Sequence, residues 1–414
     1  MRTRRRRRYR EGTPGDVTPS PARALGAAII TLTAGVLPGF LTGALGGAIG
    51  DELGFGKAGL GVAIASAYSV AAIGSVHAGE LSDRIGPRRT LLAAMAMSLL
   101  GFLGIAAFAH SLANLLVFLV IAASGHTLAG TATKVLVARQ VPLRRHGLAF
   151  GMQMAAIPFA AVLAGFAVPV ISETIGWRWA FLFGAALPVL GAAALPQEGQ
   201  PKNAVSRPRG FDHVDLPPLF VLGAAAVLAS AAATTTATFY IISAEEVGIS
   251  AGTAGSLLAA TSAAVIAVRI AFGAVADRFR GGHLTTVVLL LCTSSFGYLL
   301  MAPGIGWLFA VGALVALVFG WSWPGLMVFA LVRAYPDAPG VASAFVVGGM
   351  NLGSVIGPVV FGVVSDALSA PTAFGTLTLW TMAASLACAG GQKQLRRHST
   401  GAPRENRSGY DWHS

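Results

Sequence analysis

Long apolar runs, separated by short charged segments, dominate the chain. Twelve runs have about the 20 residues that a helix needs to cross a bilayer core. They cover residues 25–49, 58–78, 90–109, 114–137, 147–171, 179–195, 217–243, 252–275, 284–302, 307–331, 341–364 and 373–391. The first run is too long, and too closely followed by others, for a cleaved signal peptide. The pattern predicts an all-α membrane protein with twelve transmembrane helices.

A short charged motif occurs at equivalent places in the two parts of this pattern. The sequence GELSDRIGPRR at residues 79–89 follows the second run, and GAVADR at residues 273–278 follows the eighth. Residues 139–142 and 333–336, both of the form Arg-x-x-Pro, keep the same spacing. We therefore expect two copies of one six-helix module. The predicted division is a polar tail (1–24), a first bundle (25–195), a linker (196–216), a second bundle (217–392) and a second tail (393–414).

Composition and charge place these modules in lipid and suggest their orientation. Hydrophobic residues make up 55% of the chain and charged residues 11%, against about 25% charged in a soluble domain. The net charge of +12 would suit nucleic-acid binding. Nearly all Lys and Arg outside the runs lie on one predicted side of the membrane, however, and the other side has only Lys57 and Arg178. The positive-inside rule therefore predicts a multi-pass protein of the plasma (inner) membrane, with both tails cytoplasmic.

Residues 25–391 resemble the major facilitator superfamily, because they combine twelve spans, a central linker and the repeated motif. The resemblance implies two six-helix bundles that rock about a central site. It also implies that the motif residues hold the cytoplasmic gate, with Asp83 against a helix N-terminus or a loop Arg such as Arg144 or Arg145. A charged turn that only orients the protein is the alternative. The gating residues expected from the motif are Gly79, Asp83, Arg84, Gly86, Arg88, Gly273, Asp277 and Arg278.

Other positions resemble the branch of cyanate and small organic anion permeases. They are Gly125, Pro158, Gly165, Pro169 and residues 176–181. The chain departs from neighbouring branches elsewhere. Ile121 stands where many proton-coupled exporters have an Arg, and Ala156-Ile157 precede Pro158 where drug antiporters have a Gly-Pro signature. These departures disfavour a proton-driven multidrug exporter.

The polar residues within the predicted spans include basic groups but no Asp or Glu. An Arg near a helix centre costs about 2.5–3.5 kcal/mol on insertion scales, so such a residue usually faces a cavity. Arg269 resembles the Arg that oxalate and monocarboxylate transporters of the same fold have in span eight, which implies that it binds a carboxylate in bidentate fashion. The alternative is a pair with Asp277 or with helix carbonyls.

Other polar and aromatic side chains complete the expected site. His126 titrates near pH 6.5 when unperturbed and is the expected proton carrier, unless it only bonds a carbonyl. Lys134 either reaches the site or extends to the cytoplasmic surface. Pro324 predicts a break in the tenth span, and Pro38 a similar one in the first. The remaining expected substrate-binding residues are Gln153, Asn351, Trp321, Trp323 and Phe40, whereas threonines 234–238 bind substrate or join helices.

These features together predict a monomeric secondary transporter that moves a small organic anion, with protons as a candidate coupling ion. An exporter of neutral or cationic compounds is the alternative. No zinc motif, nucleophile elbow, P-loop or intramembrane carboxylate pair supports an enzyme, and no cofactor is expected. Cys292 and Cys388 lie in apolar runs, where we expect them to pack rather than to form a disulfide.

Overall fold

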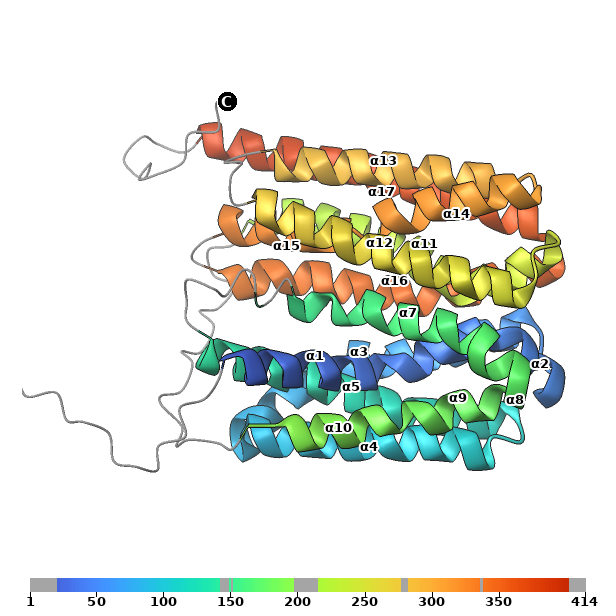
Figure 1. Ribbon diagram of the computed structural model, residues 1–414. Helices are drawn as coiled ribbons and strands as arrows, with labels where there is room; N and C mark the ends of the chain where they lie inside the picture. The colour runs from blue at the N-terminus through green and yellow to red at the C-terminus, as the bar shows by residue number, and fades with distance from the viewer. Residues whose placement is uncertain are drawn as a thin grey trace, which may run out of the picture.

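The computed structural model describes residues 21–141, 149, 152–196, 215–276, 282–335 and 338–401. Within these ranges, twelve helical segments are long and apolar enough to cross a membrane, which agrees with the predicted number. Figure 1 shows them side by side in one elongated bundle. The first six are formed by α1 (Pro21–Ala44), α3 (Lys57–Ile85), α4 (Pro87–Phe108), α5 (Leu112–Gln140), α7 (Ala156–Ala167) with η2 (Val168–Ser172) and α8 (Glu173–Ile175), and α9 (Trp177–Gly184) with α10 (Ala186–Ala194).

The second six spans follow the same order. They are formed by α11 (Leu216–Glu246), α12 (Ala251–Ala276), α13 (His283–Met301), α14 (Gly306–Gly320) with α15 (Trp323–Ala334), α16 (Pro339–Ala367) and α17 (Ala370–Gly401). A short additional helix, α2 (Gly46–Leu53), connects α1 to α3. Residues 1–20, 197–214 and 402–414, which contain most of the predicted tails and linker, lie outside the described residues.

Two close helix pairs join the halves. The two pairs are equivalent, because spans two and eight have the same place in their halves, as do spans five and eleven. Span two (α3) packs on span eleven (α16), and span five (α7) packs on span eight (α12). Glycines make these approaches possible. A Cβ on Gly61 would lie 2.4 Å from the carbonyl oxygen of Pro358, and a Cβ on Gly165 would lie 2.5 Å from that of Gly255. In lipid, such contacts between small residues let backbones approach and gain packing energy.

The repeated motif has a structural role at the turn between spans two and three. Gly86 has a φ of 86°, a conformation that residues with a side chain rarely adopt. Pro87 follows as the first residue of α4, where its missing N–H removes no helical hydrogen bond. The Gly-Pro part of the motif therefore ends one span and begins the next within a single residue.

Prolines interrupt some spans and not others. The tenth span breaks between α14 and α15 just before Pro324, as predicted, and the fifth breaks at Ala155, three residues before Pro158. The expected break at Pro38 is wrong, because α1 continues through this residue to Ala44. A proline removes one backbone hydrogen bond, and a helix packed within a bundle tolerates that loss.

Candidate functional site

A small cavity lies between the first, second and fourth spans. Its volume is about 40 Å³, and α1, α3 and α5 supply its walls. Phe40 and His126, both expected from the sequence, line this cavity together with Tyr68, which we had not identified. The cavity exceeds the roughly 10–15 Å³ that one water requires. Tyr68 was missed because nothing but its phenol distinguishes it within an apolar run.

Aromatic contacts connect this cavity to the second half of the chain. The ring of Phe40 lies 6.2 Å from the ring of Trp321, which follows α14 at the break in span ten. The guanidinium carbon of Arg269 lies 6.0 Å from the centre of the same Trp321 ring. Four expected site residues therefore form a continuous path across the interface between the halves: His126, Phe40, Trp321 and Arg269.

Arg269 is held by backbone carbonyls. Its Nε donates to the carbonyl oxygen of Trp321 at 2.9 Å, and Nη2 donates to the same oxygen. Its Nη1 donates to the carbonyl oxygen of Met154 at 3.0 Å, across the interface between α12 and span five. Helix carbonyls are one of the alternatives to a substrate at this residue, and the guanidinium bonds two of them. No Asp or Glu among the described residues forms a salt bridge with it.

The first span packs closely against the backbone of His126. A Cβ on Gly35 would lie 2.8 Å from the Cα of His126, so only glycine lets α1 and α5 approach here. The Nδ1 atom of His126 is buried and has no hydrogen-bond partner among the described residues. A buried imidazole nitrogen without a partner is costly unless a water or a ligand reaches it.

The other expected binding residues are scattered. Lys134 lies two turns beyond His126 on α5 and is exposed, whereas Asn351 is half-buried on α16. The Gln153 side chain is buried and donates to Thr133 at 2.7 Å, and Trp323 is buried in the core of the second half. In this conformation, packing within its own half surrounds each of these two side chains, and their part in substrate binding stays a prediction.

The threonines of the seventh span mainly join helices. Thr234 bonds the hydroxyl of Ser354 on α16 at 2.8 Å, and Ser230 bonds the same hydroxyl at 2.9 Å. Thr236 and Thr238 donate to carbonyls of their own helix. These bonds favour the packing alternative over substrate binding.

Part of the expected gating motif lies outside the residues that the structure describes. Gly79, Arg84, Gly86 and Arg88 are placed at the end of α3 and the start of α4. The backbone of Gly273 lies in α12. The expected residues not described are the side chain of Asp83, all of Asp277 and Arg278, and the loop arginines Arg144 and Arg145.

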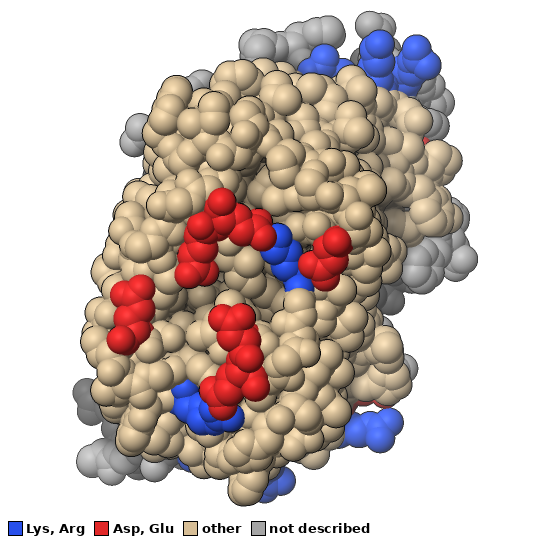
Figure 2. All heavy atoms as spheres, turned by 90° about the vertical axis from the view of Figure 1, so that its right-hand side faces the viewer, with Lys and Arg blue, Asp and Glu red and all other residues tan. Residues whose placement is uncertain are grey.

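The opposite end of the bundle carries the acidic residues of the short loops. We call it the acidic end, and it contains Asp51, Glu52, Glu173, Glu245, Glu246 and Asp366. Figure 2 shows this face, with acidic side chains gathered around two patches of Lys or Arg. The other end, which carries the turn between α3 and α4, is called the basic end.

Polar contacts at the acidic end cross between the halves. Lys57, at the start of α3, pairs with Glu246 and also donates to the hydroxyl of Ser365 at 3.0 Å. Asp366 accepts the backbone N–H of Ala58 at 2.9 Å, at the positive N-terminus of α3. These contacts join α3 to α11 and α16. In this conformation they hold the acidic ends of the two halves together.

A second ion pair at this end lies within the first half. Arg178 pairs with Glu52, and Trp177 donates its indole N–H to the same carboxylate at 2.7 Å. The hydrogen bond from Arg178 lowers the pKa of Glu52 below its ordinary value, although partial burial opposes this shift. The pair fixes α2 against α9.

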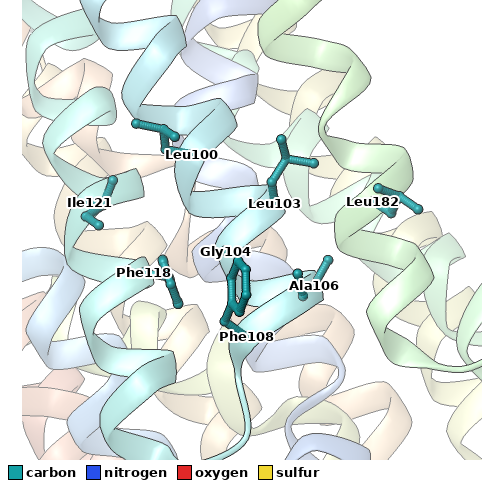
Figure 3. Close-up of a pocket in the computed structure, with 9 residues that line it drawn as sticks. Leu100, Leu103, Gly104, Ala106, Phe108, Phe118, Ile121 and Leu182 are labelled. Atoms are coloured by element: carbon teal, nitrogen blue, oxygen red, sulfur yellow. The ribbon is translucent and has the colours of Figure 1, made fainter.

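A larger groove lies on the outer surface of the first half. Its volume is about 430 Å³, and it is lined by apolar side chains of α4, α5 and α9 (Figure 3). Leu100, Phe108 and Leu182 face it. It contains none of the expected site residues, and its exposed leucines suit contact with lipid rather than a polar substrate.

Comparison with known proteins assigns the family. The profile of the Major Facilitator Superfamily matches residues 24–243 and 219–408. The chain belongs to this superfamily, and its twelve apolar helices make it a multi-pass membrane protein.

Individual relatives are more distant. A curated relative, "Putative metabolite transport protein YwtG" of Bacillus subtilis (strain 168), is 24% identical over 176 residues, 42% of this chain. The match spans about a third of that relative's length, 35%. A solved structure titled "Crystal structure of D-xylose-proton symporter" has a TM-score of 0.70, covers 88% of this chain and 95% of its own, and is 16% identical. These proteins are named for transport rather than for enzymatic activity.

Proposed function

We propose that the protein is a secondary transporter that moves a small organic anion, a carboxylate or a cyanate-like ion, by alternating access. The observation that carries the proposal is the state of Arg269. Its hydrogen bonds go to neutral carbonyls, and no carboxylate among the described residues neutralises its positive charge. A desolvated cation with spare donors attracts an anion more strongly than any other guest.

The proposed binding region lies between the halves. Arg269 supplies charge, while Trp321 and Phe40 supply an aromatic wall that leads to His126. Lys134 lies on the approach from the basic end. A cavity of about 40 Å³ suits a compact guest better than a large drug. The finer resemblance to cyanate and organic anion permeases points to the same class of substrate.

Proton coupling follows from energetics and from His126. An inside-negative potential of about 100 mV opposes the entry of a monovalent anion by about 2.3 kcal/mol. Uptake of such an anion therefore needs a proton or an exchanged anion. His126 lines the cavity and has a buried nitrogen without a partner among the described residues, so it is the proposed proton carrier.

The orientation is proposed from charge. The basic end would face the cytoplasm under the positive-inside rule. The acidic end, joined by Lys57 and Asp366, would then be the outer gate, closed in this conformation. The motif residues around Gly79 and Gly273 would close the inner gate in the other state.

Flux measurements in liposomes test this proposal. Purified wild-type protein should move radiolabelled formate or cyanate down its gradient, and Arg269→Gln should reduce that flux at least tenfold. An inward proton gradient should drive accumulation by the wild type, but not by His126→Gln. Anion flux that is unchanged in Arg269→Gln would remove this residue from the site.

The competing proposal is transport of an uncharged compound. One similar structure is of a symporter for D-xylose, which is neutral, although the likeness extends to the fold alone. Sugar flux that does not depend on Arg269, without anion flux, would favour this alternative.

A further inference from the structure

The bond between Arg269 and Met154 has a cause in the sequence of span five. In a continuous helix the carbonyl of Met154 would accept the N–H of the residue four positions later. That residue is Pro158, which has no N–H. The Met154 oxygen is therefore left without its helical donor, and the guanidinium of Arg269 supplies the missing donor from the other half of the protein.

The second carbonyl on Arg269 also belongs to an interrupted helix. Trp321 directly follows the last residue of α14, at the break before Pro324. The final carbonyls of a helix have no intrahelical partner. Arg269 thus satisfies carbonyls at two breaks, one in each half, and three of its five N–H groups make the hydrogen bonds described above. The other two N–H groups make no hydrogen bond to the described residues, and an anion that contacts the edge facing Met154 must compete with its carbonyl.

We infer that Arg269 is a shared ligand between the halves: it holds the carbonyl that Pro158 leaves free in span five, and an anionic substrate replaces that carbonyl. A carboxylate is the stronger acceptor, because its negative charge adds an attraction to the guanidinium that a neutral carbonyl lacks. Trp321, in the same half as Arg269, can keep its bond during the exchange. Substrate binding would then release α12 from span five, the helix pair that must move when the halves rock.

The claim that Arg269 holds the Met154 carbonyl does not depend on the substrate. The claim that an anion replaces this carbonyl rests on the proposed function. Pro158→Ala restores an N–H that can satisfy Met154 within its own helix. The hydrogen bond from Arg269 to Met154 should then contribute less to the stability of the protein. Pro169→Ala is the matched control, because Pro169 lies in the same span but more than two turns from Met154.

The ligand-free test is a double-mutant cycle on the thermal midpoint of the full-length protein in detergent. Arg269→Gln should lower the midpoint by several degrees in the wild-type background and by less than half as much in the Pro158→Ala background. In the Pro169→Ala background its effect should be unchanged. Equal effects of Arg269→Gln in all three backgrounds would overturn the inference.

The exchange is tested with sodium formate and sodium cyanate as probes. Each should raise the thermal midpoint of the wild type, and Pro158→Ala should lower the half-saturating concentration severalfold, because a competing carbonyl is removed. Arg269→Lys should retain a weaker response. A Pro158→Ala half-saturation equal to that of the wild type would overturn the exchange. No response to either anion in the wild type, with coupling intact in the cycle, would overturn the anion function and leave Arg269 as a bridge between the halves.

Discussion

Two cations connect the halves of this protein, and they do so in different ways. Lys57 lies at the acidic end, where it pairs with Glu246, a carboxylate whose side chain is 42% exposed. Arg269 lies inside the bundle, where it bonds the carbonyls of Trp321 and Met154. A carboxylate therefore balances the charge of Lys57, whereas no carboxylate among the described residues balances the charge of Arg269.

This difference suits the two cations to different roles: Lys57 to closing a gate, and Arg269 to binding a substrate. An ion pair at a wet surface can break and reform, because water replaces each partner at little cost, and such pairs contribute about 0–1 kcal/mol. An arginine capped by carbonyls remains attractive to an anion, because carbonyls carry no net charge. A buried carboxylate on Arg269 would have held it more tightly and removed it from binding.

The largest expected effect at the acidic end comes from bulk rather than from charge. Gly165→Ala would place a Cβ 2.5 Å from the carbonyl oxygen of Gly255 and 2.8 Å from the nitrogen of Ala259. Backbone atoms cannot move aside locally, so overpacking should cost the closed acidic end about 1–3 kcal/mol. The ratio of closed to open protein should fall about fivefold to about 150-fold.

Disulfide formation across this end measures the closed population. Gly47→Cys and Ile242→Cys form a suitable pair, because a Cβ on Gly47 would lie 3.8 Å from Cγ1 of Ile242. The background replaces Cys292 by Ser and Cys388 by Ala. Gly375→Ala is the control, since a Cβ there meets nothing within 4 Å. Wild-type cross-linking rates in Gly165→Ala would show that this glycine contact does not hold the gate.

The fold could be predicted from the sequence because lipid imposes a strong length rule on each apolar run. Arg269 and His126 could be selected for a related reason, since charge and titratable groups are rare in a span. The carbonyl partners of Arg269 could not be predicted in detail. They depend on two helix breaks, one of which, at Ala155, lies three residues before the proline that causes it.

The packing around other expected residues could not be predicted from the sequence. Gln153 and Trp323 are polar or aromatic residues at suitable depth, yet each points into its own half. Pro38 does not break α1, although Pro324 coincides with a break in span ten. The partners of Lys57 could not be predicted, because Glu246 and Ser365 are distant from it in sequence.

Removing the Lys57 charge should have a smaller effect than Gly165→Ala. Lys57→Gln loses an ion pair worth about 0.2–1 kcal/mol, so cross-linking between Gly47→Cys and Ile242→Cys should slow by less than about sixfold. The charge-swapped pair Lys57→Glu with Glu246→Lys should recover part of the loss. Lys393→Gln, at the basic end, is the control. A loss that exceeds that of Gly165→Ala would make the ion pair, rather than the glycine contact, the main closure of this gate.

The smallest expected effect concerns the ion pair that does not cross the halves. The hydrogen bond from Arg178 lowers the pKa of Glu52 below its ordinary value of 4.5. Its contribution to stability is therefore present above this value and is lost as the pH falls through the lowered folded-state pKa. Glu52→Gln should slightly lower the thermal midpoint at neutral pH and reduce its decline in acid. Cross-linking between the halves should be unchanged, because Glu52 and Arg178 belong to the same half. Midpoint curves that run parallel from about pH 7 to about pH 3 would contradict the assigned pKa shift, and slower cross-linking would contradict the separation between this pair and the gate.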